Sequence, residues 1–211
     1  MSSPLLVLER AVALSRALER AGLRHAIGGA LALGYHVSEP RGTRDIDVNV
    51  TVDPADPQEL FHNLPPQVRW SAQDVDRASR DGQVRLFWPV EDELPLPVDL
   101  FLPQHEFHGV VAGRSELVPM LDALVPVLSA TDLTVFKVLF DRRKDWGDIE
   151  ALVRFGQVDQ PEVVRWLSDI VGADDDRISR FLALAREVGR PTAEVPVAAV
   201  LFGRRKPRLG D

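Results

Sequence analysis

Two aspartates spaced two residues apart, Asp45 and Asp47, open an alternating and β-branched run in the segment RGTRDIDVNV, residues 41–50. In a strand, residues i and i+2 project from the same face, so the two carboxylates would lie side by side. Like charges this close repel each other, and a divalent cation between their oxygens relieves the repulsion. The spacing indicates a site for one Mg²⁺ ion or two, although a solvated strand end would have the same pattern.

A third aspartate, Asp99, lies within the apolar segment PVDLFL, residues 97–102. Burying an aspartate in an apolar strand is costly unless it is paired or bound to a metal. If this strand lies beside the first one, Asp99 completes a site of three carboxylates. The alternative is a buried aspartate that backbone donors or an arginine satisfy.

Candidate phosphate-binding residues precede the first two aspartates. Gly28 and Gly29 separate a short apolar strand from a short helix, and a glycine turn at a helix start offers backbone N–H groups to a phosphate. A plain tight turn would have the same sequence. Arg41 can hold a phosphate with its guanidinium. Thr43 would share the face of Asp45 and place its hydroxyl at the edge of the metal site.

Lys137 falls on the apolar face of a predicted helix. Leu133, Phe136, Lys137 and Phe140 follow the spacing i, i+3, i+4 and i+7, which places all four on one side. A buried ammonium needs an anion, and either an aspartate or a bound triphosphate would serve. The alternative is a packed stem with the charged end in water.

Two aspartates in the next helix are candidate partners of that lysine. Asp145 is centred on the apolar stripe of this helix, and Asp148 lies beside it. Either aspartate facing inward would orient Lys137. The alternative is a carboxylate at a helix start, where the helix dipole favours negative charge.

The composition narrows the classes of protein. The 211 residues carry a formal net charge of −7, which disfavours general coating of nucleic acid, and they include no cysteine, which excludes disulfides and thiolate metal sites. No apolar run is long enough for a membrane span, and no signal peptide is evident. The absence of cysteine makes a cytoplasmic protein the default expectation. Basic clusters at 142–144 and 204–208 are either solvated surface or contacts for a polyanion.

The order of the predicted helices and strands indicates an α/β (α+β) fold, in which a mixed sheet with flanking helices is followed by a helical half. We expect an α/β domain over residues 1–115 and a helical domain over 116–211 that contributes Lys137, Asp145 and Asp148 to the site. The predicted elements are a helix at 4–21, a strand at 23–27, a helix at 30–36, a strand at 45–52, a helix at 55–63, strands at 83–88 and 97–102, and helices at 131–142, 145–155, 160–171 and 175–188.

In this order the motifs resemble the nucleotidyltransferase superfamily, whose core is the minimal polymerase-β-like palm. They are most similar to AbiEii-type, or MenT-like, toxins of toxin–antitoxin systems. The resemblance rests on Gly28-Gly29, on RGTRDID at 41–47, on VDLF at 98–101, and on the stretch from Lys137 to Leu152. It spans about residues 23–155.

The resemblance implies an enzyme of the EC 2.7.7 type that moves a nucleotide from an NTP to a hydroxyl and releases pyrophosphate. In related toxins the acceptor is the 3′ end of tRNA, and a cognate antitoxin controls the toxin. Asp45 and Asp47 would be metal ligands, Asp99 the third carboxylate and base, and Lys137 a triphosphate contact. Thr43 holds the place of a hydroxyl residue that is phosphorylated in some of these toxins.

Two other functions fit the same residues. The acceptor can be a protein hydroxyl or a cationic small molecule such as an aminoglycoside, which the acidic net charge would suit. The chain can also be a non-catalytic nucleotide-binding module of the antitoxin type, although the full set of three carboxylates and the inward lysine argue against this.

Overall fold

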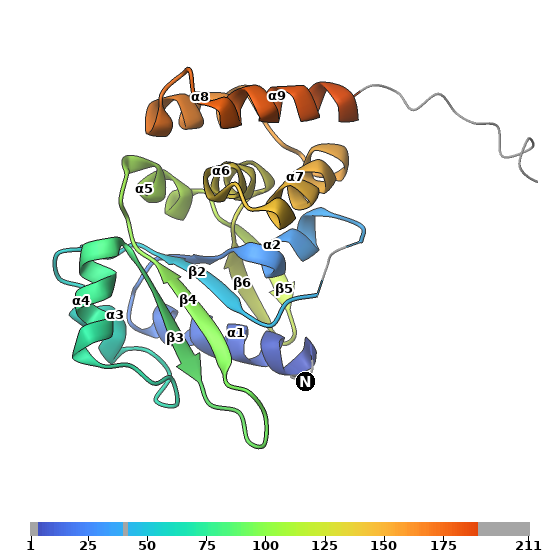
Figure 1. Ribbon diagram of the computed structural model, residues 1–211. Coiled ribbons are helices and arrows are strands. Elements are labelled where there is room, and N and C mark those ends of the chain that lie inside the picture. The colour runs from blue at the N-terminus through green and yellow to red at the C-terminus, as the bar shows by residue number, and fades with distance from the viewer. Residues whose placement is uncertain (1–3, 40–41, 190–211) are drawn as a thin grey trace, which may run out of the picture.

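A mixed sheet of six strands forms the centre of the protein in the computed structural model, which describes residues 4–39 and 42–189 (Figure 1). The order across the sheet is β3-β4-β2-β1-β6-β5. The pairs β2–β4 and β1–β6 are parallel, and the other neighbours are antiparallel. The strands are β1 (His25–Ile27), β2 (Ile46–Val50), β3 (Gln83–Trp88), β4 (Leu96–Phe101), β5 (Glu116–Met120) and β6 (Ala123–Val127).

Helices cover the sheet and extend beyond it. They are α1 (Pro4–Arg20), α2 (Gly29–His36), α3 (Gln58–His62), α4 (Ala72–Asp81), α5 (Glu106–Gly113), α6 (Ala130–Phe140), α7 (Arg143–Phe155), α8 (Gln160–Val171) and α9 (Asp176–Val188). The α1 helix packs against β1 and β6, while α6 contacts α2, α7 and α8. Figure 1 shows α8 and α9 as the outermost layer, above α6 and α7. Within the described ranges, no helix has both the length and the apolar character needed to cross a membrane.

Alternating burial along β2 and β4 sets which side chains can do chemistry. Ile46, Val48 and Val50 of β2 are buried, whereas the residues between them are only half-buried. The same alternation holds along β4. Because side chains alternate between the two faces of a strand, the apolar set enters the core and Asp47 and Asp99 share the opposite face.

A tight turn between α6 and α7 positions the second group of predicted site residues. Helix α6 ends at Asp141, which adopts a left-handed conformation with φ of 51°. The Asp141 carboxylate accepts hydrogen bonds from Trp146 Nε1 at 2.6 Å and from Arg180 at 3.1 Å. The first bond ties the start of α7 to this turn and the second ties α9 to it, and the first turns of α7 face Lys137 in the last turn of α6.

The predicted mixed α/β fold with flanking helices is confirmed, and the strands at 45–52, 83–88 and 97–102 are present with small shifts at their ends. The helices α4 and α5 and the strands β5 and β6 were not predicted from the sequence. The strands β5 and β6 each contain a proline, Pro119 and Pro126, and a proline within an apolar run argues against a strand. The domain division at residue 115 stays a prediction. The β5–β6 hairpin, which follows this position, is part of the central sheet. Arg41 and the basic cluster at 204–208 lie outside the described residues.

Candidate active site

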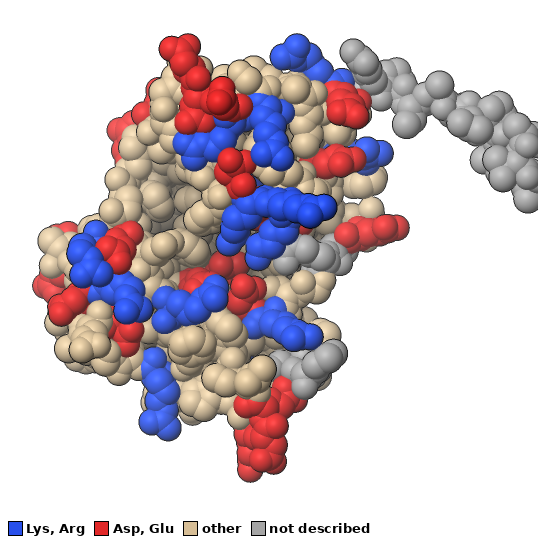
Figure 2. Space-filling model, in the orientation of Figure 1, with Lys and Arg blue, Asp and Glu red and all other residues tan. Residues whose placement is uncertain are grey.

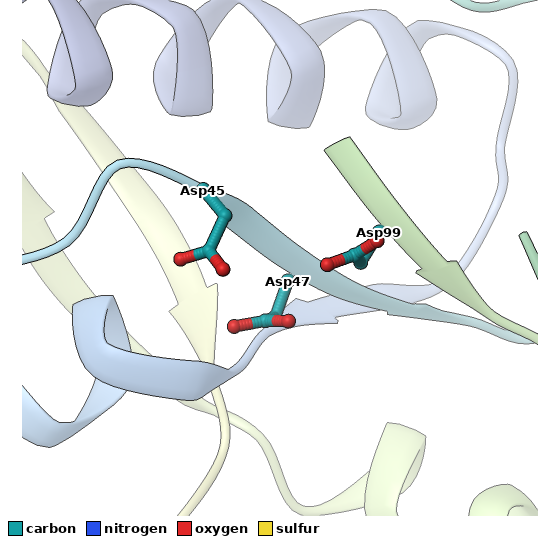
Figure 3. Close-up of side chains that lie close together, drawn as sticks. All are labelled: Asp45, Asp47 and Asp99. Atoms are coloured by element: carbon teal, nitrogen blue, oxygen red, sulfur yellow. The ribbon is translucent and has the colours of Figure 1, made fainter. Parts of the chain in front are cut away.

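Three carboxylates, two from neighbouring strands and one from the residue just before β2, meet on one face of the sheet (Figure 3). Asp47 of β2 lies directly opposite Asp99 of β4 in the parallel register, and Asp45 precedes β2 on the same face. One oxygen of each side chain lies within 4.8 Å of the other two. We name these three residues the carboxylate cluster. The expected juxtaposition of Asp45, Asp47 and Asp99 is therefore present.

Asp47 is the least compensated member of the carboxylate cluster. Burial and the neighbouring charges of Asp45 and Asp99 raise its pKa from 3.8 to about 6, against an opposing effect of Arg142 and Lys137. Within the described ranges, no hydrogen-bond donor reaches its carboxylate. Three converging carboxylates with this mutual repulsion are the hard oxygen ligands that Mg²⁺ prefers, so the cluster fits a divalent cation.

The other two members have partners. The Thr43 hydroxyl donates a short hydrogen bond to the Asp45 carboxylate, as the shared face of these residues predicted. The Arg85 guanidinium donates to both oxygens of Asp99, with Nε–Oδ1 at 2.8 Å and Nη2–Oδ2 at 2.6 Å. Asp99 thus belongs to the carboxylate cluster and is also paired with an arginine, so the two alternatives that the sequence left open occur together. Arg85 was not among the predicted site residues, because only the β3–β4 register places it opposite Asp99.

The two glycines let α2 begin against Asp47. The Gly28 N–H donates to the Asp47 carbonyl oxygen at 2.8 Å. Gly29 has a φ of +56°, and a Cβ atom built there would lie 1.7 Å from Asp47 Oδ2. Only glycine fits this position, because any side chain would displace the carboxylate. The phosphate-binding role of Gly28 and Gly29 stays a prediction.

Lys137 is buried and paired, with 3% of its side chain exposed. Its ammonium lies 2.5 Å from Asp148 Oδ2 and 3.7 Å from Asp145 Oδ1. Both aspartates of α7 therefore face the lysine, and the alternative in which its charged end reaches water is wrong. We name Lys137, Asp145 and Asp148 the lysine cluster. Asp145 also accepts from Arg142 Nε at 2.6 Å, which connects this cluster to the site.

A cleft of about 410 Å³ opens beside the carboxylate cluster. Asp47 and Asp99 line it together with three arginines: Arg77 from α4, Arg85 from β3, and Arg142 from the α6–α7 turn. Figure 2 shows this face of the molecule, where Lys and Arg side chains border the acidic ones. A smaller cavity of about 30 Å³ shares Asp47 and Arg142 with the cleft and is also lined by Gly29 and Lys137. The cleft therefore combines an acidic floor with a basic border.

No protein-family model matches the chain, and no curated protein matches it by sequence. Among solved structures, it is similar to an antigenic nucleotidyltransferase-like protein from Paracoccidioides brasiliensis, with a TM-score of 0.53 and 15% identity over 86% of this chain and 88% of that one. The chain has a nucleotidyltransferase-like fold.

Two further solved structures match this chain with lower TM-scores. For a candidate nucleotidyltransferase from H. pylori the TM-score is 0.45 and the identity is 13%, and the match covers 90% of this chain and 93% of that one. The protein JHP933 from Helicobacter pylori gives 0.43 and 15%, with coverage of 87% and 81%. The fold that the resemblance implied is supported by the first of these structures, and the AbiEii-type assignment stays a prediction.

Proposed function

We propose that this protein is a Mg²⁺-dependent nucleotidyltransferase that moves a nucleotide from an NTP to the 3′ end of tRNA. The observation that carries the proposal is the carboxylate cluster at the floor of an arginine-bordered cleft, on a nucleotidyltransferase-like fold. In the transfer, the acceptor hydroxyl oxygen bonds to the α-phosphorus of the NTP. The bond from that phosphorus to the oxygen bridging toward the β-phosphate breaks, and pyrophosphate leaves.

Asp45, Asp47 and Asp99 are the residues that would hold the metal. Bound there, Mg²⁺ would supply positive charge that neutralises the triphosphate and the charge that develops during transfer. Burial first, and then the charges of Asp45 and Asp99, raise the pKa of Asp47 to about 6, and a cation bound there would offset both effects.

Residues on the α2 and α6 side of the cluster would hold the triphosphate. Lys137 lines the smaller cavity together with Gly29, so its ammonium is near a phosphate bound at the start of α2. Arg142 lines both cavities, and Asp145 holds its guanidinium toward the cleft. A guanidinium in this place can bind a phosphate through two parallel hydrogen bonds. The hydroxyl proton of the acceptor would go to Asp99.

The tRNA acceptor and the toxin role rest on the resemblance to AbiEii-type toxins and on the basic border of the cleft. Nucleotide added to the 3′ end of tRNA would block aminoacylation, and so translation. Thr43 offers a means of control by a cognate antitoxin. Its hydroxyl bonds to Asp45, so a phosphoryl group there would bring negative charge against the carboxylate cluster.

Labelling with each α-³²P NTP in Mg²⁺ tests the proposal, with total tRNA or a mixture of proteins as acceptors. We expect label in tRNA, at a rate reduced roughly a hundredfold or more by Asp47→Asn. Asp122→Asn is the matched control, because it makes the same change at an exposed residue of the β5–β6 turn. Label found only in protein would show that the acceptor is a protein hydroxyl and not tRNA. Absence of label from every acceptor and every NTP would contradict the transferase assignment.

A further inference from the structure

Arg85 occupies the oxygens of Asp99 that the metal site would need. The two residues face each other across the antiparallel β3–β4 pair. The guanidinium contacts both Asp99 oxygens, at 2.8 and 2.6 Å, which is the two-pronged geometry of a strong arginine–carboxylate pair. Asp99 also lies within the carboxylate cluster, so its oxygens are shared between two possible positive partners.

We propose that Arg85 is an internal counter-ion of Asp99 that competes with the divalent cation. While Arg85 holds Asp99, only Asp45 and Asp47 are left to bind a cation, and the guanidinium adds a repulsive positive charge beside them. Metal binding by the full cluster requires Arg85 to release Asp99. This inference rests on the proposed function, because it assigns a control to the same metal site.

The surroundings of Arg85 allow it to leave. Its side chain is 55% exposed, whereas that of Asp99 is 13% exposed. The Arg114–Asp132 pair provides a contrast, since Asp132 is fully buried there and Arg114 also binds Glu162. An exposed guanidinium with one partner can turn into water at small cost, whereas Arg114 is fixed from two sides. Arg85 also lines the 410 Å³ cleft. Once released from Asp99, its guanidinium would contact the phosphates of a substrate bound in this cleft.

The expected consequence is linkage between the two ligands. A cation on Asp99 and a phosphate on Arg85 each favour the separated state, so each should strengthen binding of the other. Without an anionic substrate, Arg85 weakens the metal site.

Mn²⁺ binding, followed by electron paramagnetic resonance in the absence of nucleotide, tests the inference. Arg85→Gln removes the competing charge, and we expect it to bind Mn²⁺ about tenfold more tightly than the wild-type protein, a change of about 1.4 kcal/mol. Arg80→Gln is the matched control. Arg80 is exposed on α4 and pairs with Asp81, so the same charge is lost near the cleft but outside the cluster. We expect wild-type affinity from this variant.

A second background isolates the contact with Asp99. Adding Arg85→Gln to Asp99→Asn should tighten Mn²⁺ binding much less than in the wild-type background, because only the repulsion from the guanidinium is then removed and the competition for the Asp99 carboxylate is already absent. Equal tightening in both backgrounds would reveal a general charge effect and overturn the inference. Wild-type affinity in Arg85→Gln would overturn the inference and leave the metal site of the proposed function intact. If the folded wild type, Arg85→Gln and Arg80→Gln proteins all fail to bind Mn²⁺, then this inference and the metal site of the proposed function are both wrong.

Discussion

The carboxylate cluster and the lysine cluster lie on either side of Arg142 and are built in opposite ways. In the lysine cluster, one ammonium lies between two carboxylates, and Arg142 pairs with one of them. In the carboxylate cluster, three negative charges converge and Asp47 has no donor within the described ranges. The lysine cluster is buried, whereas the carboxylate cluster is half-buried and lines the cleft.

The difference shows which group is neutralised by its own residues and which one is left with excess negative charge. The buried charges of the lysine cluster are paired and hydrogen-bonded before any ligand binds, and they position Arg142 at the edge of the cleft. The half-buried carboxylates of the other cluster repel one another, and a bound cation would relieve this repulsion. Removing charge should therefore destabilise the protein at the lysine cluster and stabilise it at the carboxylate cluster.

The largest expected effect follows from Lys137→Met, which keeps an unbranched side chain, one atom shorter, and removes its charge. Asp148 and Asp145 would then lose their buried partner, and we expect the free energy of unfolding to fall by about 3–5 kcal/mol. Urea denaturation measures this change. Lys144→Met is the matched control, since Lys144 is exposed on the same helix as the two aspartates and should change stability by less than about 0.5 kcal/mol. Equal stability of the Lys137 and Lys144 variants would contradict the structural role of the lysine cluster.

Asp47 should give a smaller effect of the opposite sign, visible as a dependence on pH. Its pKa in the folded protein, about 6, is above the usual value of 3.8, so its carboxyl binds a proton more tightly when folded. Its contribution to stability is fully present below pH 3.8 and is lost as pH rises through 6, a loss of about 3 kcal/mol. Asp47→Asn should remove this loss, so the variant should be more stable than wild type at pH 8 and similar at pH 4.

The measurement is the difference in unfolding free energy between wild type and Asp47→Asn at each pH, which cancels the other carboxyl groups. In EDTA the difference should grow from pH 4 to pH 8. In Mg²⁺ it should shrink or reverse at pH 8, because the cation stabilises only the wild-type cluster. A difference that is constant with pH would contradict the raised pKa of Asp47. A difference that is insensitive to Mg²⁺ would contradict metal binding at the carboxylate cluster.

Much of the site could be predicted because it depends on local periodicity. The strand period placed Asp45 and Asp47 on one face, and the helix period placed Lys137 inside. The costs of burying Asp99 and Lys137 predicted that each needs a partner. These arguments use only residues close in the chain and the free energy of burying a charge.

Arg85 could not be predicted in this way, because its contact depends on the register between two strands. The loop between β3 and β4 sets that register, and a slip of one residue would turn Arg85 to the other face of the sheet. Likewise, β6 joins β1 through tertiary pairing that Pro126 made improbable from sequence alone. Which of the two aspartates faces Lys137 depended on the α6–α7 turn at Asp141, and the structure turns both toward it.

The smallest expected effect concerns Thr43, whose hydroxyl is a neutral partner of the carboxylate cluster. Thr43→Val removes one hydrogen bond to a charged acceptor that is only partly buried, so we expect a loss of about 1 kcal/mol in EDTA. The lost bond leaves Asp45 with more unbalanced charge, and a cation would compensate for it. Mg²⁺ should therefore restore most of the wild-type stability. If the loss were the same in EDTA and in Mg²⁺, Asp45 would not be a ligand of the metal, and the cation would have to bind to Asp47 and Asp99 alone.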